Sequence, residues 1–117
     1  LDKFSFIKER VIEALGKLNL DNRKVLKALK KSLLDSSPMV RINAIEAIMN
    51  SDSDEAPELI RSCLKDEDKE VQKNALIAMY NLEGKDIIDE VLLSNEYSDY
   101  LKEEAQDLLN EYEANDE

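Results

Sequence analysis

The stretch that decides the fold is Asp35 together with the residues that follow it, SSPMVRINAIEAI at 36–48. Its pattern returns in residues 66–79, DEDKEVQKNALIAM, and more faintly in residues 96–109, EYSDYLKEEAQDLL. Reading backwards, residues 40–48 match residues 7–15, IKERVIEAL. A recurrence every thirty residues or so is typical of a stacked array of helical units rather than of one globular core. The repeat therefore predicts an array whose usual task is to bind other molecules.

Apolar residues recur at helical spacing through nearly all of the chain. Ser37 and Pro38 form a helix start, with serine as the N-cap and proline in the first helical position, and Gly84 forms a helix end. No run of alternating apolar and polar residues indicates a strand. We expect helices at approximately these residues: 2–18, 21–34, 37–50, 54–64, 67–82, 87–92 and 98–112.

Short loops between these helices predict antiparallel pairs. The expected fold is therefore all-α, an armadillo-like α-solenoid of about three and a half helical hairpins. We expect one repeat domain over residues 1–117, with a half repeat at 1–18, full units at 19–50, 51–82 and 83–113, and a frayed acidic tail at 114–117. The first unit lacks its leading helix and the chain begins with leucine, which suggests a part of a longer protein.

Charge is divided unevenly along the chain, whose net charge is −11. Residues 1–50 carry ten Lys or Arg against six Asp or Glu, whereas residues 51–117 carry six against twenty-one. An acidic chain disfavours nucleic-acid binding, because that affinity comes mostly from cations that neutralise phosphates. The single cysteine, Cys63, cannot form an internal disulfide, and this favours a cytoplasmic protein.

The repeat resembles the HEAT family, and in particular the short HEAT-like units of phycobilin lyases. Leu64, Lys65 and Asp66 stand where those units have Leu-x-Asp at the turn, and Pro57 stands in the preceding helix. The preceding unit has Leu34–Asp35 and Ser37–Pro38. The Val-Arg and Ala-x-x-Ala signature appears in both units, as Val40, Arg41, Ala44 and Ala47 and as Val71, Gln72, Ala75 and Ala78.

The resemblance implies a hydrogen-bonded ladder between neighbouring units, built by the turn acid and the helical arginine. Asp35 and Arg41 are expected to form it here, and Asp66 and Gln72 hold the same positions one unit later. Because Gln72 replaces the arginine, we expect a broken or weakened ladder at that unit. Gln106 replaces an apolar residue of the earlier units and predicts a solvent-facing end.

The resemblance also places the second helix of each unit on a concave face. Aligned there, the exposed positions form three rungs: Arg10, Asn43, Asn74 and Glu104; Lys17, Asn50, Asn81 and Glu111; and Glu13, Glu46, Ile77 and Asp107. All of these except Glu13 and Asp107 are predicted to contact a partner, an extended peptide oriented by charge and by amide hydrogen bonds. The alternative interpretation is a solvated helix surface without a binding role.

A second candidate surface is the basic helix over residues 21–34. Its cations are Arg23, Lys24, Lys27, Lys30 and Lys31, of which Lys24, Lys27 and Lys31 share one face. Such a cluster suits an acidic protein, a phosphate backbone or anionic lipid, and it is also compatible with simple solvation.

Catalytic features are few. The chain has no histidine, so it lacks the commonest general base and metal ligand, and it has no glycine-rich phosphate loop. We therefore predict no catalytic residues, no metal and no cofactor. The expected function is a protein–protein interaction scaffold, with a protein as partner and no membrane. Two alternatives stay open: a lyase-like or regulatory subunit acting on a tetrapyrrole-bearing protein or small molecule, and nucleic-acid association through the basic helix.

Overall fold

The computed structural model describes the backbone of residues 3–18 and 23–115, and the side chains of these residues except 3 and 15–18. This part of the chain contains α-helices and one 3-10 helix, without a strand. The elements are α1 (Lys3–Leu18), α2 (Arg23–Ser32), α3 (Pro38–Met49), α4 (Ala56–Arg61), η1 (Ser62–Lys65), α5 (Lys69–Glu83), α6 (Lys85–Leu93) and α7 (Asp99–Asn115).

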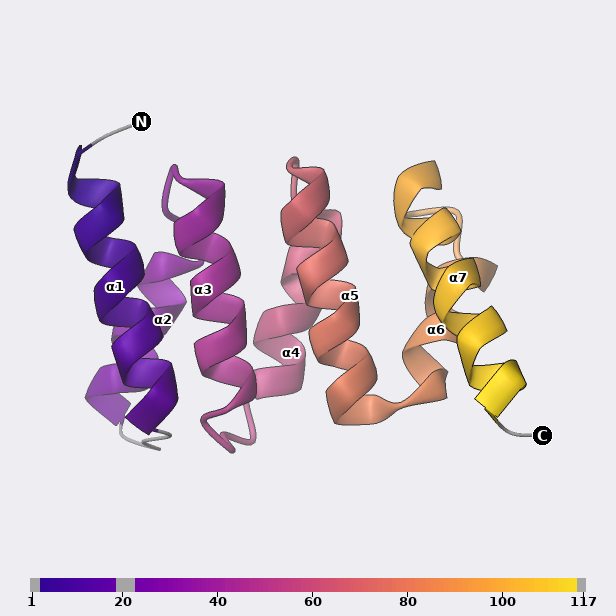
Figure 1. Ribbon diagram of the computed structural model, residues 1–117, viewed down its shortest axis with the longest axis horizontal. Helices are drawn as coiled ribbons and strands as arrows, with labels where there is room; N and C mark the ends of the chain where they lie inside the picture. The colour runs from indigo at the N-terminus through magenta and orange to yellow at the C-terminus, as the bar shows by residue number, and fades with distance from the viewer. Residues whose placement is uncertain (1–2, 19–22, 116–117) are drawn as a thin grey trace.

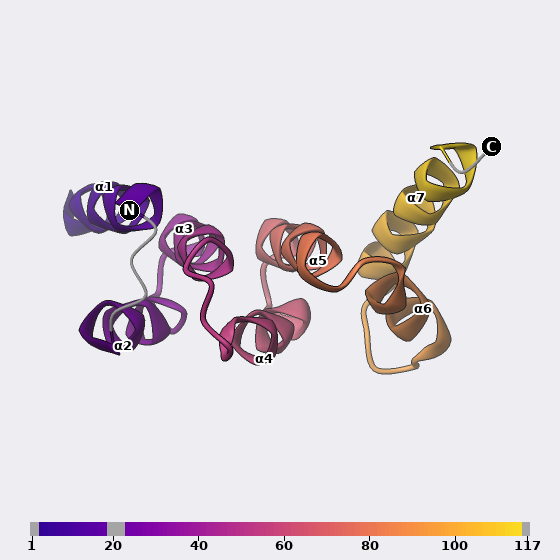
Figure 2. The same cartoon turned by 90° about the horizontal axis from the view of Figure 1, so that it is seen from below.

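The helices form two rows, which Figure 1 shows face-on and Figure 2 shows from below. One row holds α1, α3, α5 and α7, and the other holds α2, α4 and α6. α4 packs on both α3 and α5, and α6 packs on both α5 and α7, so each row closes the gaps of the other. The molecule extends over 42 × 28 × 21 Å. This is the α-solenoid that the repeat predicts.

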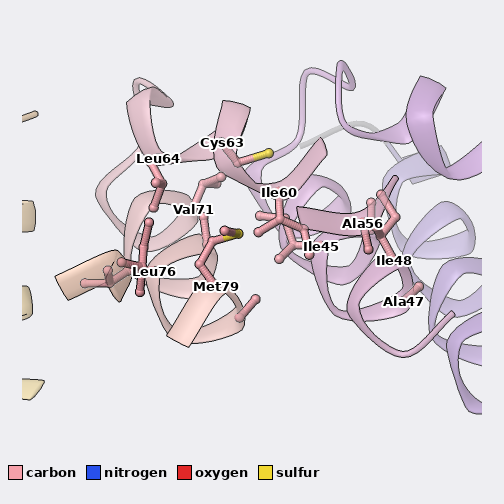
Figure 3. Close-up of a cluster of buried hydrophobic side chains, with 14 of the residues drawn as sticks. Ile45, Ala47, Ile48, Ala56, Ile60, Cys63, Leu64, Val71, Leu76 and Met79 are labelled. Atoms are coloured by element: carbon pink, nitrogen blue, oxygen red, sulfur yellow. The ribbon is translucent and has the colours of Figure 1, made fainter. Parts of the chain in front are cut away.

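The repeated apolar positions form the core. Val40, Ala44, Val71 and Ala75 have no exposed surface, and Ala47 is 3 % exposed. Figure 3 shows how larger side chains of α3, α4, η1 and α5 fill the space between the rows. Small alanine side chains let neighbouring helices approach closely, while the larger residues interdigitate between them. The same small-and-large pattern therefore gives each unit the same packing.

Helix ends agree with the cap residues of the sequence. The Ser37 hydroxyl accepts from the backbone amide of Val40 at 3.4 Å, and Asp68 accepts from Glu70 and Val71 at 2.9 and 3.1 Å. Gly84 ends α5 with a φ of 73°, a conformation that glycine adopts at little cost. These caps satisfy backbone amides that would otherwise lack partners at the helix starts.

Most boundaries lie within about two residues of the expected ones, and the main differences concern α4 and α7. The helix expected over 54–64 is divided into α4 and η1, and the tighter 3-10 turn holds Cys63 and Leu64 in the core. α7 continues to Asn115, past the expected end near residue 112, so Ala114 and Asn115 are helical rather than frayed, whereas residues 116–117 lie outside the described part. Helical spacing alone does not locate an end that has no proline or glycine.

Burial at the C-terminal end of the array follows the expectation. Ile12, Ile45 and Leu76 are at most 4 % exposed, while Gln106 at the corresponding position is exposed and its amide donates to Asn110 Oδ1 at 3.1 Å. A polar residue in this position lets the last helix face water.

Arg41 connects two neighbouring units. Its Nε and one terminal nitrogen donate to the two carboxylate oxygens of Asp66, at 2.9 and 3.0 Å. The other terminal nitrogen donates to the backbone carbonyl of Asp35 at 2.7 Å. The side chains of Arg41 and Asp66 are only 8 % and 12 % exposed, and the Asp66 hydrogen bond raises the pKa of the guanidinium. A bidentate pair with so little exposure fixes the orientation of one unit on the next.

The pairing therefore differs from the expected Asp35–Arg41 contact. The carboxylate of Asp35 instead accepts from Lys8 Nζ at 2.8 Å and from the Ser37 amide at 2.9 Å. Each cationic side chain thus reaches forward to the turn acid of the following unit. This happens because the acid of its own unit lies at the start of the same helix, where only the backbone carbonyl faces the guanidinium.

At Gln72 the ladder is kept in an uncharged form rather than broken. Its Nε2 donates to the backbone carbonyl of Asp66 at 2.6 Å, as Arg41 does to Asp35. Its Oε1 accepts from the hydroxyl of Ser98 at 2.6 Å. The charged Arg41–Asp66 contact is thus replaced at the next interface by a neutral one, in which the partner is the N-cap serine of α7, whose hydroxyl also accepts from the Leu101 amide at 3.1 Å. In the described residues, no buried side-chain nitrogen or oxygen lacks a partner.

The contact between Lys8 and Asp35 makes the stability of the fold at low pH depend on the Asp35 carboxylate. The hydrogen bond from Lys8, reinforced by the Ser37 amide, lowers the pKa of the Asp35 carboxyl. Because the pKa of Asp35 is lower in the folded state, its carboxylate contributes fully to the free energy of unfolding above the unfolded-state pKa of about 4. This contribution disappears as the pH falls through the folded-state pKa. We expect Asp35→Asn to lose no more than about 1 kcal/mol at pH 7, because Lys8 is half exposed. Urea unfolding from pH 7 to pH 3 should show the difference in stability between wild type and Asp35→Asn shrinking as the pH falls. A difference that stays constant would contradict a stabilising role for the Asp35 carboxylate.

Candidate partner-binding surface

The exposed face of α3, α5 and α7 contains two neighbouring hollows. The first, of about 160 Å³, lies between α3 and α5. Glu46 and Met49 border it on α3, and Asn74, Ile77 and Asn81 border it on α5. Asn81 Nδ2 lies 3.7 Å from the sulfur of Met49, so the two helices also make contact at its edge.

The second hollow, of about 290 Å³, lies between α5 and α7. In Figure 2 α7 leaves the row of α1, α3 and α5 at an angle, so that this face turns inward there. Glu104, Asp107 and Glu111 of α7 line the hollow, and Lys73 and Ile77 line it from α5. Three carboxylates opposite one ammonium group favour a cationic ligand.

Ile77 borders both hollows and is 40 % exposed. Its counterparts in the neighbouring units are Glu46 and Asp107, which border one hollow each. The surface therefore has an apolar centre between two acidic edges. Around this centre the half-buried residues Ile42, Met49 and Leu108 add apolar area. A partly exposed apolar patch with a polar rim is the usual composition of a protein-binding site.

The structure thus brings together six of the predicted partner-binding residues: Glu46, Asn74, Ile77, Asn81, Glu104 and Glu111. Asn74 is half-buried, and one N–H of its amide donates to the Glu70 backbone carbonyl at 2.8 Å, so that its second N–H and its carbonyl oxygen are left for a ligand. Asn43 and Asn50 line neither hollow, and Asn50 forms the end of α3.

The rung residues of α1 lie apart from these hollows. Arg10 is exposed, with its guanidinium 5.2 Å from the centroid of the Phe6 ring and 3.9 Å from Glu13. The side chain of Lys17 lies outside the described residues. Among the described side chains, the two hollows therefore include amide and acidic members of the predicted gradient, and its basic member Arg10 lies outside them.

Sequence reasoning missed the apolar members Ile42, Met49 and Leu108, together with Lys73. These residues lie next to the predicted rung positions on their helices. Helical spacing alone does not show whether a residue at the border between the exposed and the buried side contributes to the surface. The signal that marks the site is Ile77, an apolar residue at a position that is acidic in both neighbouring units.

The basic helix is α2, and four of its five cations are exposed: Arg23, Lys24, Lys27 and Lys31. Lys30 is half-buried and donates to Glu55 Oε1 at 2.8 Å. It therefore fastens the loop before α4 instead of adding to the free surface. The cationic stripe of α2 belongs to the opposite row of the array from the two hollows.

Cys63 lies in η1, is 5 % exposed and takes no part in these surfaces. Burial raises the pKa of its thiol, which favours the neutral form and makes the residue a small apolar member of the core. No group of three or more acidic or thiol side chains within the described ranges is arranged to hold a metal ion. In the same residues, no helix has both the length and the apolar character needed to span a membrane.

Comparison with known proteins agrees with the architecture. The family model of HEAT repeats matches the chain twice, over residues 2–81 and over residues 32–110. The curated proteins and the solved structures compared with the chain gave no match. HEAT repeats generally act as protein-interaction scaffolds and are typically non-catalytic. The two overlapping matches span the same units as the helical pairs and the ladder, and the chain belongs to the HEAT-repeat family.

Proposed function

We propose that this protein is an interaction module that binds a partner protein through the α3/α5/α7 face. The observation that carries the proposal is the exposure of Ile77 between two hollows whose rims carry Glu46 and Glu111. An apolar side chain of the partner would be buried against Ile77, and basic groups beside it would meet the carboxylates. Apolar burial supplies most of the affinity of such contacts, and charge sets orientation and association rate.

The amide groups on α5 favour an extended segment as the ligand. Asn74 and Asn81 border the same hollow, seven residues apart on one side of the helix. Each can form hydrogen bonds with a peptide backbone, which an extended chain presents and a helix does not. The proposed ligand is therefore an extended peptide with one apolar side chain flanked by lysine or arginine.

A displayed peptide library selected on the intact protein provides the test. We expect the enriched peptides to carry this pattern, and we expect Ile77→Ala to weaken their binding about tenfold in isothermal titration calorimetry, because an interface centre is lost. The substitution changes no charge, so the general attraction of a basic peptide to an acidic protein is unaffected.

Leu93→Ala is the matched control, since Leu93 on α6 is 85 % exposed and lies outside both hollows. Glu104→Gln combined with Glu111→Gln should weaken binding mainly at low ionic strength. Selected peptides whose affinity is the same for wild type, Ile77→Ala and Leu93→Ala would exclude this face as the site.

A further inference from the structure

The end of the array formed by α1 and α2 leaves apolar residues exposed that every other unit buries. Ile7 and Val11 are 57 % and 52 % exposed. Their counterparts in the following units have no exposed surface; these are Val40 and Ala44, Val71 and Ala75, and Leu101 and Ala105. Each of those pairs belongs to a helix that packs on its own leading helix, α2, α4 or α6. Beside α1 the described chain places no such leading helix.

The exposed pair borders the largest of the three hollows, about 530 Å³ in volume. Ile7, Val11 and Ile12 of α1 form one side, and Ala28 and Lys31 of α2 lie on the other. α2 packs chiefly on α3 and leaves this space between itself and α1. The result is an apolar groove that runs between two helices, which is the shape that receives the apolar side of a third helix.

The charges around the groove indicate which kind of helix would bind there. Lys31 lines the groove, and Lys24 lies on the same face of α2 as Ala28 and Lys31, at spacings of four and three residues. Lys27 is exposed beside them. The acid in the groove, Asp35, already accepts a hydrogen bond from Lys8. The rim is therefore cationic overall and complements carboxylates.

We propose that the α1/α2 groove is a second docking site, which takes an acidic amphipathic helix of a partner protein. The chain itself provides the template, because α6 packs on α7 and α5, buries Ile87, Ile88 and Val91, and carries Asp86, Asp89 and Glu90 among its nine residues. A helix of the same character would bury its apolar side on Ile7 and Val11 and direct carboxylates to the lysines of α2. This site does not depend on the α3/α5/α7 face or on the function proposed for it.

The test uses a fluorescent peptide with the sequence of residues 85–96, KDIIDEVLLSNE, held helical by a lactam between its first and fifth residues. Without such a link, a peptide of this length is mostly unfolded in water. We expect saturable binding to the intact protein in fluorescence anisotropy, weakened at least about tenfold by Val11→Asp, which puts a carboxylate among apolar contacts. Val11 is half exposed, and circular dichroism should show an unchanged fold.

Further variants distinguish charge-dependent binding in the groove from non-specific apolar association. Lys24→Glu combined with Lys31→Glu should weaken binding of the acidic peptide and strengthen binding of a peptide whose acids are replaced by lysine. Leu93→Asp and Ile77→Ala, which lie outside the groove, should leave binding unchanged. The proposal is overturned if the wild type gives no saturable binding, or if Val11→Asp and Leu93→Asp bind equally well. It is also overturned if the protein associates with itself through Val11, because the occupant would then be a second copy.

Discussion

Replacing Arg41 with alanine is expected to lower the free energy of unfolding by about 3 kcal/mol, a large part of the total for a domain of this size. The substitution leaves the Asp66 carboxylate, 12 % exposed, without its two charged hydrogen bonds. It also removes the donor to the Asp35 carbonyl. Removing one partner from a nearly buried pair costs more than the pair itself contributes, because the remaining charge stays desolvated. Urea unfolding monitored by circular dichroism measures the loss.

Arg61→Ala is the control for this prediction. Arg61 also pairs with two carboxylates, those of Glu83 and Glu90, but its side chain is 36 % exposed. Solvent therefore screens the pair and hydrates the acids when the arginine is removed, so that the expected loss is below about 1 kcal/mol. Equal losses in the two variants would mean that burial of the ladder is not what makes Arg41 important.

Ile60→Ala is expected to cost about 4 kcal/mol, through lost apolar burial and a cavity that the packed helices cannot close. Ile60 has no exposed surface, and Figure 3 shows it beside Ile45. α4 has only six residues, and its buried residues are Ile60 and Ala56. Truncating Ile60 therefore removes most of the apolar surface by which α4 is held on α3 and α5.

The adjacent Leu59→Ala separates this effect from helix propensity, because Leu59 is half-buried in the same helix. We expect it to cost about 1 kcal/mol in the same unfolding experiment. A loss for Ile60→Ala no greater than that for Leu59→Ala would show that α4 is not anchored through the core.

Much of the fold could be predicted from the repeat. The positions of Val40, Ala44 and their counterparts predict which side of each helix is buried, because a repeating unit buries the same positions every time. Ser37, Pro38 and Gly84 predict helix ends for local steric and hydrogen-bonding reasons. Gln106 predicts an outward-facing position on α7, because a polar residue replaces one that is buried in the earlier units.

Four residues of the ladder were predicted, but their pairing and the participation of Lys8 and Ser98 were not. Spacing along one chain cannot show that Arg41 reaches Asp66, 25 residues away, in preference to Asp35, which is nearer in sequence. It also cannot show that Gln72 contacts the N-cap hydroxyl of Ser98 in the next unit instead of a turn acid. Both depend on the rotation between neighbouring units, which only the packed structure defines.

Most of the polar lining of the candidate site and its apolar centre, Ile77, were predicted, whereas Lys73 and the apolar residues Ile42, Met49 and Leu108 were missed. The rungs identify Asn74, Asn81 and Glu111 as outward-facing because helical periodicity defines direction. Whether Ile42 and Met49 contribute surface depends instead on the separation of α3 and α5. For the same reason the sequence does not show that Lys31 of the basic helix borders an apolar groove, whose width is set by the separation of α1 and α2.

The most direct test of the central claim, that the α3/α5/α7 face binds the partner, is the spectrum of isoleucine δ1-methyl groups during titration with a library-selected peptide. Ile77 and Ile42 report on this face, and Ile7 reports on the α1/α2 groove. Ile88, which has no exposed surface, reports on the core and serves as the internal reference. We predict that the Ile77 and Ile42 signals shift in proportion to occupancy while those of Ile7 and Ile88 stay in place. Shifts at Ile7 without any at Ile77 would contradict the claim.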